Sequence, residues 1–247
     1  MSLPVFIHPD LSAAQAGDAI TLSGPEARHA VTVKRMQQGE KLALIDGTGI
    51  RLTLTVTETS GKDHLTGTVD SVTHLPEPHP RVTVVQAIPK SERAELAVDL
   101  ATQAGADEII AWQADRCVAK WDGKKAPKAV AKWQAAAEAA AKQSRRDRIP
   151  QVRGPLTTRQ LVAELAERAE SASVLVLHEE ATESIREVGL HGEVFLLVGP
   201  EGGIGEEELT TLREAGAVAI KLGPEVLRTA SAAMVALAAI GMRTERW

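Results

Sequence analysis

Residues 195–209 read FLLVGPEGGIGEEEL, and this stretch decides the fold of the second part of the chain. The apolar run 195–198 stops at Gly199-Pro200, which is typical of a buried strand followed by a turn. Glu206, Glu207 and Glu208 then place negative charge on the first turn of a helix, where the helix dipole favours it. The stretch therefore predicts a strand, a glycine loop and a helix, and ligands bind at such junctions in open α/β sheets.

A second stretch, IKLGPEVLRTASAAM (220–234), has the same order of strand, Gly-Pro-Glu loop and helix. A third apolar strand, VLVLH (174–178), ends in the same region of the chain, and we expect the three strand ends to line one crevice. Neither loop contains Lys or a phosphate-binding glycine pattern, so the glycines and nearby carboxylates suit a neutral or cationic adenosine-type ligand better than a phosphate. The alternative is a pair of ordinary turns with Glu201 and Glu225 in solvent.

The region from residue 81 onward alternates apolar strand candidates with helical segments, which favours a mostly parallel sheet with helices on both faces. The predicted strands are 82–88, 108–112, 173–178, 193–199 and 217–223, and the predicted helices are 91–104, 126–144, 157–171, 205–215 and 228–243.

The first part of the chain is rich in short strands with alternating apolar residues, for example KLALIDGTGIRLTLTVTETSG (41–61), and contains one predicted helix at 25–36. This pattern favours a small β-barrel. THLPEPHPR (73–81) follows, with prolines at alternate positions, and reads as a stiff linker. We therefore predict two domains, 1–74 and 75–247.

The composition excludes several classes of protein. The 247 residues are 44% apolar and 25% charged, which is ordinary for a globular protein, and no run is long enough to span a membrane. No signal peptide is recognisable, and the single cysteine, Cys117, fits a reducing cytoplasm and is better explained as an inert buried residue than as a nucleophile. No Cys/His cluster has zinc spacing, so we expect no metal.

The charge is unevenly distributed. The net charge is −5, but residues 112–153 contain eleven Lys or Arg against four acids. Such a segment is either an RNA-binding footprint or a solvated helix face. Because aromatic residues are only 2% of the chain, nucleic-acid binding is expected to use phosphates and shape rather than base stacking.

Five motifs together resemble the bacterial small-subunit ribosomal RNA uridine-N3 methyltransferases, a family of the SPOUT class. They are the two glycine loops, EARHAVTVKRM (26–36), DRCVAKW (115–121) and KWQAAAEAAAKQSRRDRIPQV (132–152), which occur in the family's order over essentially the whole chain. Two of the family's usual acids are absent, since Gln103 and the pair Ala230-Ser231 stand in their places. A role for those acids in catalysis is therefore doubtful in this chain.

The resemblance implies a PUA-like β-barrel followed by an α/β domain whose carboxyl-terminal chain forms a trefoil knot. It also implies a homodimer that methylates N3 of a specific uridine in 16S ribosomal RNA of the small ribosomal subunit, with S-adenosyl-L-methionine bound in the knot. Two alternatives stay open: a SPOUT enzyme that modifies another RNA position, such as a ribose 2′-hydroxyl, and a non-catalytic RNA-binding protein.

The resemblance also assigns residues. Arg228 is the candidate for stabilising the uracil anion, or else a tie between the loops, and Glu201 either contacts the ligand or caps its own loop. His178 is as readily structural as functional, and no general base is identified. The predicted cofactor-binding residues are Leu177, His178, Glu179, Val198, Gly199, Glu201, Gly202, Gly203, Leu222, Gly223, Leu227, Arg228, Thr229 and Ala230. The predicted RNA-binding residues are His29, Lys34, Arg35, Arg116, Lys142, Arg145, Arg146 and Arg148.

Overall fold

The computed structural model describes residues 3–90 and 93–247, which group into two compact units. The first unit contains the chain up to Glu77 together with Ala141–Ile149, and the second contains Pro78–Ala140 and Pro150–Trp247. The short return of the chain at Ala141–Ile149 is not part of the sequence-based division at residue 75. In the described ranges, we find no helix with the length and apolar character needed to cross a membrane.

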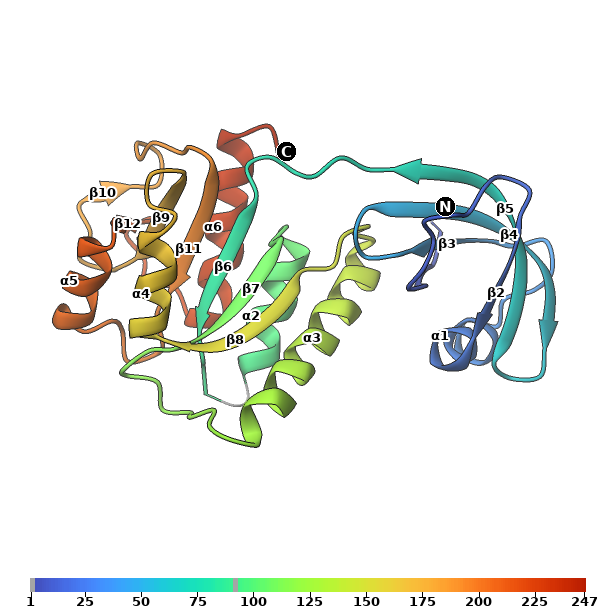
Figure 1. Cartoon of the computed structure of the whole chain (residues 1–247), viewed down its shortest axis with the longest axis horizontal. Coiled ribbons are helices and arrows are strands. Elements are labelled where there is room, and N and C mark those ends of the chain that lie inside the picture. Colours follow the sequence, from blue (N-terminus) through green and yellow to red (C-terminus); the bar gives the residue numbers. More distant parts are fainter. Residues whose placement is uncertain (1–2, 91–92) are drawn as a thin grey trace. The chain divides into compact units, whose positions relative to one another are not determined.

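The first unit is built on a five-stranded sheet with the order β1-β3-β4-β5-β2 (Figure 1). The strands are β1 (Val5–Ile7), β2 (Ala19–Ser23), β3 (Lys41–Ile45), β4 (Ile50–Ser60) and β5 (His64–His74). β1 pairs parallel with β3 and the other pairs are antiparallel. Since β1 and β2 are both edges, the predicted barrel is open, as a PUA-like half-barrel. The predicted helix 25–36 divides into α1 (Gly24–Arg28) and a π-helical turn, η1 (His29–Val33).

The second unit is built on a seven-stranded parallel sheet with the order β10-β12-β9-β11-β6-β7-β8. The strands are β6 (Val82–Ala87), β7 (Glu108–Gln113), β8 (Gln151–Thr157), β9 (Ala172–Leu177), β10 (Glu183–Ser184), β11 (Glu193–Val198) and β12 (Val218–Lys221). All residues of β6 are buried, because the strand lies inside the sheet and both of its faces are covered.

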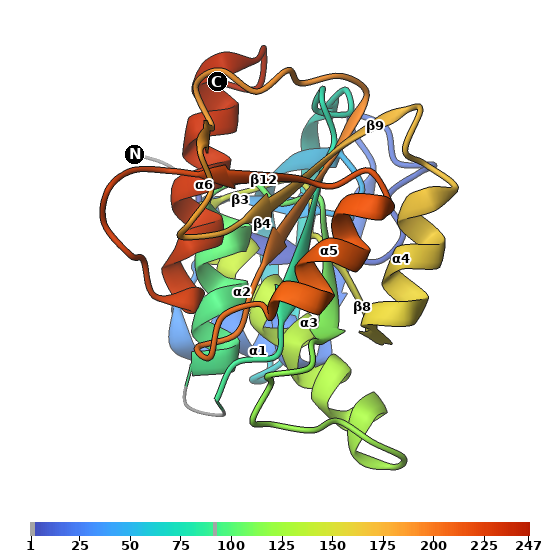
Figure 2. The same ribbon diagram turned by 90° about the vertical axis from the view of Figure 1, so that its left-hand side faces the viewer.

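Helices cover both faces of this sheet. α2 and α6 pack against each other on one face, and α4 and α5 lie on the other (Figure 2). The helices are α2 (Ala94–Gln103), α3 (Lys125–Ser144), α4 (Thr158–Ala166), α5 (Glu206–Glu214) and α6 (Thr229–Arg243). The predicted start of α2 at residues 91–92 lies outside the described residues.

Two strands are absent from the set predicted by apolar patterning. β8 contains Gly154-Pro155, which interrupts the apolar pattern. A proline is tolerated there because β8 is an edge strand, whose neighbour in the sheet is β7. β10 has only two residues, too few for any periodicity. The predicted helix 157–171 ends at Ala166, although its start is well defined by a reciprocal capping box between Thr157 and Gln160.

Candidate active site

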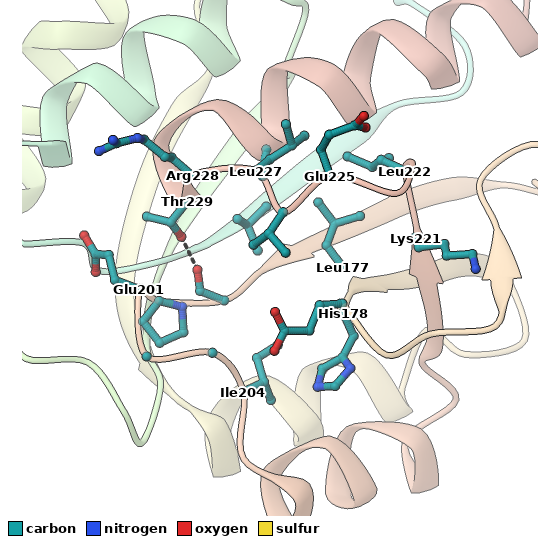
Figure 3. A pocket seen from close by; sticks show the side chains of 18 of the residues that line it. Leu177, His178, Glu201, Ile204, Lys221, Leu222, Glu225, Leu227, Arg228 and Thr229 are labelled. Carbon is teal, nitrogen blue, oxygen red and sulfur yellow. Dashed lines mark hydrogen bonds between the residues drawn. The ribbon is translucent and has the colours of Figure 1, made fainter.

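A cavity of about 550 Å³ lies at the carboxyl ends of β12, β9 and β11, three neighbouring parallel strands (Figure 3). Because the strands are parallel, the loops that follow them emerge at the same edge of the sheet. The lining residues are Arg93, Arg116, Leu177, His178, Glu179, Val198, Gly199, Pro200, Glu201, Gly202, Gly203, Ile204, Ile220, Lys221, Leu222, Gly223, Glu225, Val226, Leu227, Arg228, Thr229 and Ala232.

The two glycine loops are joined by one side chain. The hydroxyl of Thr229, a residue only 7% exposed, donates a hydrogen bond to the carbonyl oxygen of Gly199 (Figure 3). Thr229 opens α6 after the second loop, and Gly199 opens the first loop directly after β11. This bond fixes the start of α6 to the end of β11.

Two glycines are required by the geometry of the first loop. A Cβ atom at Gly199 would lie 2.8 Å from Cγ1 of Ile204, so the loop folds back on itself with no room for a side chain there. Gly203 has φ +70°, a conformation that L-residues rarely adopt, and its position faces open space. The turn is closed by the Gly203 amide, which donates to the Pro200 carbonyl at 2.9 Å.

Of the predicted cofactor-binding residues, all except Ala230 line the cavity. Ala230 is 3% exposed and packs into the core instead. The reason is the period of α6. Thr229 and Ala232 are three residues apart and share a face, whereas Ala230 is turned away from it.

Several lining residues were not predicted. Arg93 precedes α2 in the connection that follows β6, another strand whose carboxyl end lies at this edge. Its place after a predicted strand and at a helix start was the signal that could have found it. The others are Pro200, Ile204, Ile220, Lys221, Glu225, Val226 and Ala232, which lie within or next to the quoted motifs.

Arg228 and Glu201 have different surroundings. Among the described residues, the Arg228 guanidinium has no hydrogen-bond or ion-pair partner, and its side chain is exposed. Glu201 is also exposed, but its Oε1 accepts a hydrogen bond from the amide of Lys90 at 3.1 Å, so it links the first glycine loop to the connection after β6. Figure 3 shows both side chains on the same side of the cavity, away from Lys221.

His178 is held as part of a turn. Its Nδ1 accepts a hydrogen bond from the amide of Glu180 at 3.3 Å, and its own amide donates to the Ile220 carbonyl at 3.0 Å. These bonds account for a structural role, while the ring still borders the cavity.

The turn after β7 also reaches the cavity. Arg116 donates from Nη1 to the Gly202 carbonyl at 3.1 Å and lines the cavity. The next residue, Cys117, is 4% exposed, and burial raises the pKa of its thiol. A buried thiol with a raised pKa is a poor nucleophile.

Two of the predicted RNA-binding residues have partners inside the first unit. Lys142 Nζ lies 2.5 Å from Glu26 Oε1, and Arg148 Nη2 donates to the Leu75 carbonyl at 2.8 Å. These contacts, with the ion pair between Arg51 and Asp147, tie the returning segment 141–149 to the five-stranded sheet. His29 packs edge-to-face on Phe6, with ring centroids 5.7 Å apart. Arg146 is partly buried.

The basic segment 112–153 is not a single free cluster. Lys132 pairs with Glu95, and Arg153 pairs with Glu108 and Glu164, in addition to the partners of Lys142 and Arg148. Counting charges along the sequence therefore overstates the cations that are available to a ligand.

Arg35 and Arg145 differ from the other basic residues of the first unit. They are exposed, and they are the non-glycine residues with positive φ in the described ranges, at 54° and 60°. Arg145 follows the last residue of α3, and the Arg146 amide donates to the Ala141 carbonyl at 2.9 Å. This is a Schellman ending, whose left-handed position normally carries glycine.

The positions of the two missing family acids are explained locally. Gln103 is exposed at the end of α2, bonds to Asp99 at 3.0 Å and does not line the cavity. The Ser231 hydroxyl donates to the Arg228 carbonyl at 3.1 Å within the first turn of α6.

Comparison with known protein families gives two matches. A family model described as an RNA methyltransferase domain matches residues 76–241, and one described as an RNA methyltransferase PUA domain matches residues 22–70.

Individual relatives cover nearly the whole chain. The chain is 52% identical to the ribosomal RNA small subunit methyltransferase E of Mycobacterium bovis over 94% of this chain and 89% of that protein. It is 30% identical to the protein of the same name from Bacillus subtilis, over 97% and 96% of the two chains.

Solved structures are similar over the same extent. A methyltransferase of Legionella pneumophila, solved with its cofactor S-adenosylmethionine bound, has a TM-score of 0.86 at 29% identity and covers 98% of each chain. The ribosomal RNA small subunit methyltransferase E of Neisseria gonorrhoeae has the same fold, with a TM-score of 0.86 at 24% identity and 98% coverage of each chain.

The bond between the loops yields a prediction. Thr229→Val keeps the shape of the side chain but leaves the Gly199 carbonyl without its donor, and we expect the free energy of unfolding to fall by about 1–3 kcal/mol. Urea unfolding followed by tryptophan fluorescence measures this, because all four tryptophans, at 112, 121, 133 and 247, are in the second unit. Thr229→Ser, which retains the hydroxyl, is the control. Equal stability of the Val variant and the wild type would show that the bond contributes nothing.

Proposed function

The chain belongs to the family of the ribosomal RNA small subunit methyltransferases E, and we propose that it methylates N3 of one uridine in 16S ribosomal RNA of the small ribosomal subunit. It is an S-adenosylmethionine-dependent RNA methyltransferase of the SPOUT fold, with a PUA-like RNA-binding domain before the catalytic one. The observation that carries the proposal is the single cavity that two glycine loops form at the strand ends, joined by Thr229 and Gly199.

The cavity suits S-adenosylmethionine. At Gly203 the backbone borders open space, so a ligand can approach the main chain closely there. Glu179, Glu201 and Glu225 line the same cavity as Arg93, Arg116, Lys221 and Arg228, so the cavity wall carries both signs of charge. S-adenosylmethionine also carries both, with a sulfonium and an ammonium that suit the acids and a carboxylate that suits a cation. The bound cofactor supplies an electrophilic methyl group on a positively charged sulfur.

The residues of the chain then have to place uracil N3 in line with that methyl group and stabilise the negative charge that develops on the uracil when N3 loses its proton. Positioning by the two loops supplies much of the rate enhancement. Arg228 is the candidate for charge stabilisation, because its guanidinium is exposed at the cavity and has no partner among the described residues.

The direct test is methylation of small ribosomal subunits from cells that lack this protein, followed by nucleoside mass spectrometry. We expect one 3-methyluridine per 16S ribosomal RNA. Appearance of 2′-O-methyluridine instead would favour the other SPOUT activity. Calorimetric titration with S-adenosylmethionine separates both from a non-catalytic protein, for which no binding is expected.

Arg228 is tested by kinetics. If it stabilises the uracil anion, Arg228→Ala should lower kcat and kcat/KM together by roughly 10²–10³, with cofactor affinity nearly unchanged. Arg228→Lys should recover only part of the rate, because an ammonium lacks the planar set of donors. Lys221→Ala removes a cation from the other side of the cavity and is the matched control. Loss of cofactor binding or of stability in Arg228→Ala would identify Arg228 as a tie between the loops.

The strained backbone conformation of Arg35 and Arg145, which both have positive φ, supports an RNA-binding role for these two residues. A non-glycine residue in the left-handed region costs on the order of 1–2 kcal/mol, which glycine would avoid. Both side chains are exposed and neither has a partner among the described residues, so nothing in the fold of the first unit accounts for an arginine at these positions. We propose that the two guanidinium groups contact RNA phosphates, with Lys34 beside Arg35.

This role predicts opposite effects on stability and binding. Arg35→Gly and Arg145→Gly should each raise the stability of the first unit by about 1 kcal/mol, because the strain is relieved. Each should also flatten the slope of log affinity against log salt for small subunits by about 0.7–0.9. Scanning calorimetry and filter binding measure the two effects, and Arg145→Lys, which keeps charge and strain, is the control. An unchanged salt slope would show that these arginines are merely solvated.

We also propose that the protein acts in the cytoplasm as a homodimer. The exposed face of α6 carries Met234, Val235 and Met242, which are 37%, 42% and 76% exposed, and a second copy could bury them. Light scattering should give the mass of two chains, and a monomer at micromolar concentration would contradict this part of the proposal.

A further inference from the structure

Glu208 is a buried carboxylate in the first turn of α5. It is 4% exposed, although Glu206 and Glu207 on the same turn are exposed. Its Oε1 accepts two hydrogen bonds, from the amide of Asp115 at 3.0 Å and from the hydroxyl of Thr158 at 2.5 Å. Its Oε2 is buried and has no hydrogen-bond partner among the described residues. A carboxylate is costly to bury in this way, so its presence requires a reason.

The two donors come from different elements. Asp115 lies in the turn after β7, and Thr158 opens α4, where its hydroxyl also accepts from Trp112 Nε1 at 3.0 Å. The bond from Thr158 therefore holds α4 to α5. The bond from the Asp115 amide instead fixes the backbone of the turn after β7, directly before Arg116.

Arg116 lies along the first glycine loop. Its Nη1 donates to the Gly202 carbonyl at 3.1 Å, and Gly205 is beside its guanidinium, since a Cβ there would lie 3.5 Å from Nε and Nη2. The turn is thus attached to this region twice, by its backbone to Glu208 and by the Arg116 side chain to Gly202. A guanidinium has five N–H donors and only one is used within the described residues, while the side chain is exposed and lines the cavity.

We infer that Glu208 is a positioning residue: its carboxylate fixes the backbone at Asp115, so that the Arg116 guanidinium is held at the cavity with free donors to bind an oxyanion. This inference rests on the proposed function, because the oxyanion is either an RNA phosphate beside the target uridine or the carboxylate of the methyl donor. Glu208 itself contacts neither. Because the turn is already fixed before binding, Arg116 loses less conformational entropy when it binds the oxyanion.

The test is a double-mutant cycle. Arg116→Ala and Glu208→Ala should each weaken oxyanion binding about tenfold, as expected for a charge-assisted hydrogen bond. The KM for small subunits rises if the oxyanion is an RNA phosphate, and the calorimetric Kd for S-adenosylmethionine rises if it is the cofactor carboxylate. The double variant should be no worse than Arg116→Ala alone, because Glu208 acts through Arg116.

Three further variants keep the cycle interpretable. Glu208→Gln retains an acceptor oxygen and should restore most of the affinity. Thr158→Val removes the other donor to the same oxygen but leaves the Asp115 bond, and Glu207→Ala removes an exposed acid from the same helical turn. Both should leave KM and Kd within twofold of the wild type.

Two results would overturn the inference: multiplicative effects of the two alanine substitutions on KM or Kd, or unchanged values in both single variants. Either result counts only if the wild-type protein methylates small subunits in the same assay. Failure of the wild type to do so is a failure of the proposed function instead. If Glu208→Ala does not fold, the inference is tested by the two remaining variants: Arg116→Ala should weaken binding about tenfold and Glu208→Gln should not, and an unchanged KM and Kd in Arg116→Ala would overturn it.

Discussion

One hydrogen bond, from the Thr229 hydroxyl to the Gly199 carbonyl, makes two separate turns into one site. Each glycine loop alone would be an ordinary strand-to-helix connection. The bond sets the start of α6 against the end of β11, and α6 in turn packs on α2 and on the central strands β6 and β11. The position of the cavity wall is therefore coupled to the core of the second unit. Any adjustment of the loops on ligand binding is therefore confined to their residues beyond Gly199 and before Thr229.

The order of strands explains why such a bond is possible. β9 lies between β12 and β11, and both pair with it in parallel. The loops after β11 and β12 therefore leave the same edge of the sheet with one strand between them, although they are more than twenty residues apart in sequence. Leu177 at the end of β9 and His178 directly after it line the cavity between the two loops.

The sequence predicted most of this arrangement because its signals are local. The apolar run before Gly199, the acidic first turn of α5 and the repeated Gly-Pro-Glu each act within a few residues, and the strand-end rule converts them into one crevice. The edge strand β8 was not among the predicted strands, because Gly154-Pro155 interrupts its apolar residues. Ala230 was assigned to the cavity because a motif does not show which way a helical residue faces. Arg93 was missed because the sequence, which does indicate that it follows a strand end, does not show that β6 lies next to β11 in the strand order.

Charge was the least predictable property, for a physical reason. Eleven basic residues in 42 positions look like one footprint in sequence, but Lys142 and Arg148 hold the returning segment 141–149 on the first unit, and Arg153 is enclosed by Glu108 and Glu164. A cation that already has a partner or a packing role cannot also give its full charge to RNA. Arg35 and Arg145 differ, since their backbones are strained and their side chains have no hydrogen-bond or ion-pair partner among the described residues. Backbone conformation and partners, rather than charge density along the chain, thus distinguish the arginines that build this protein from those that are available for a ligand.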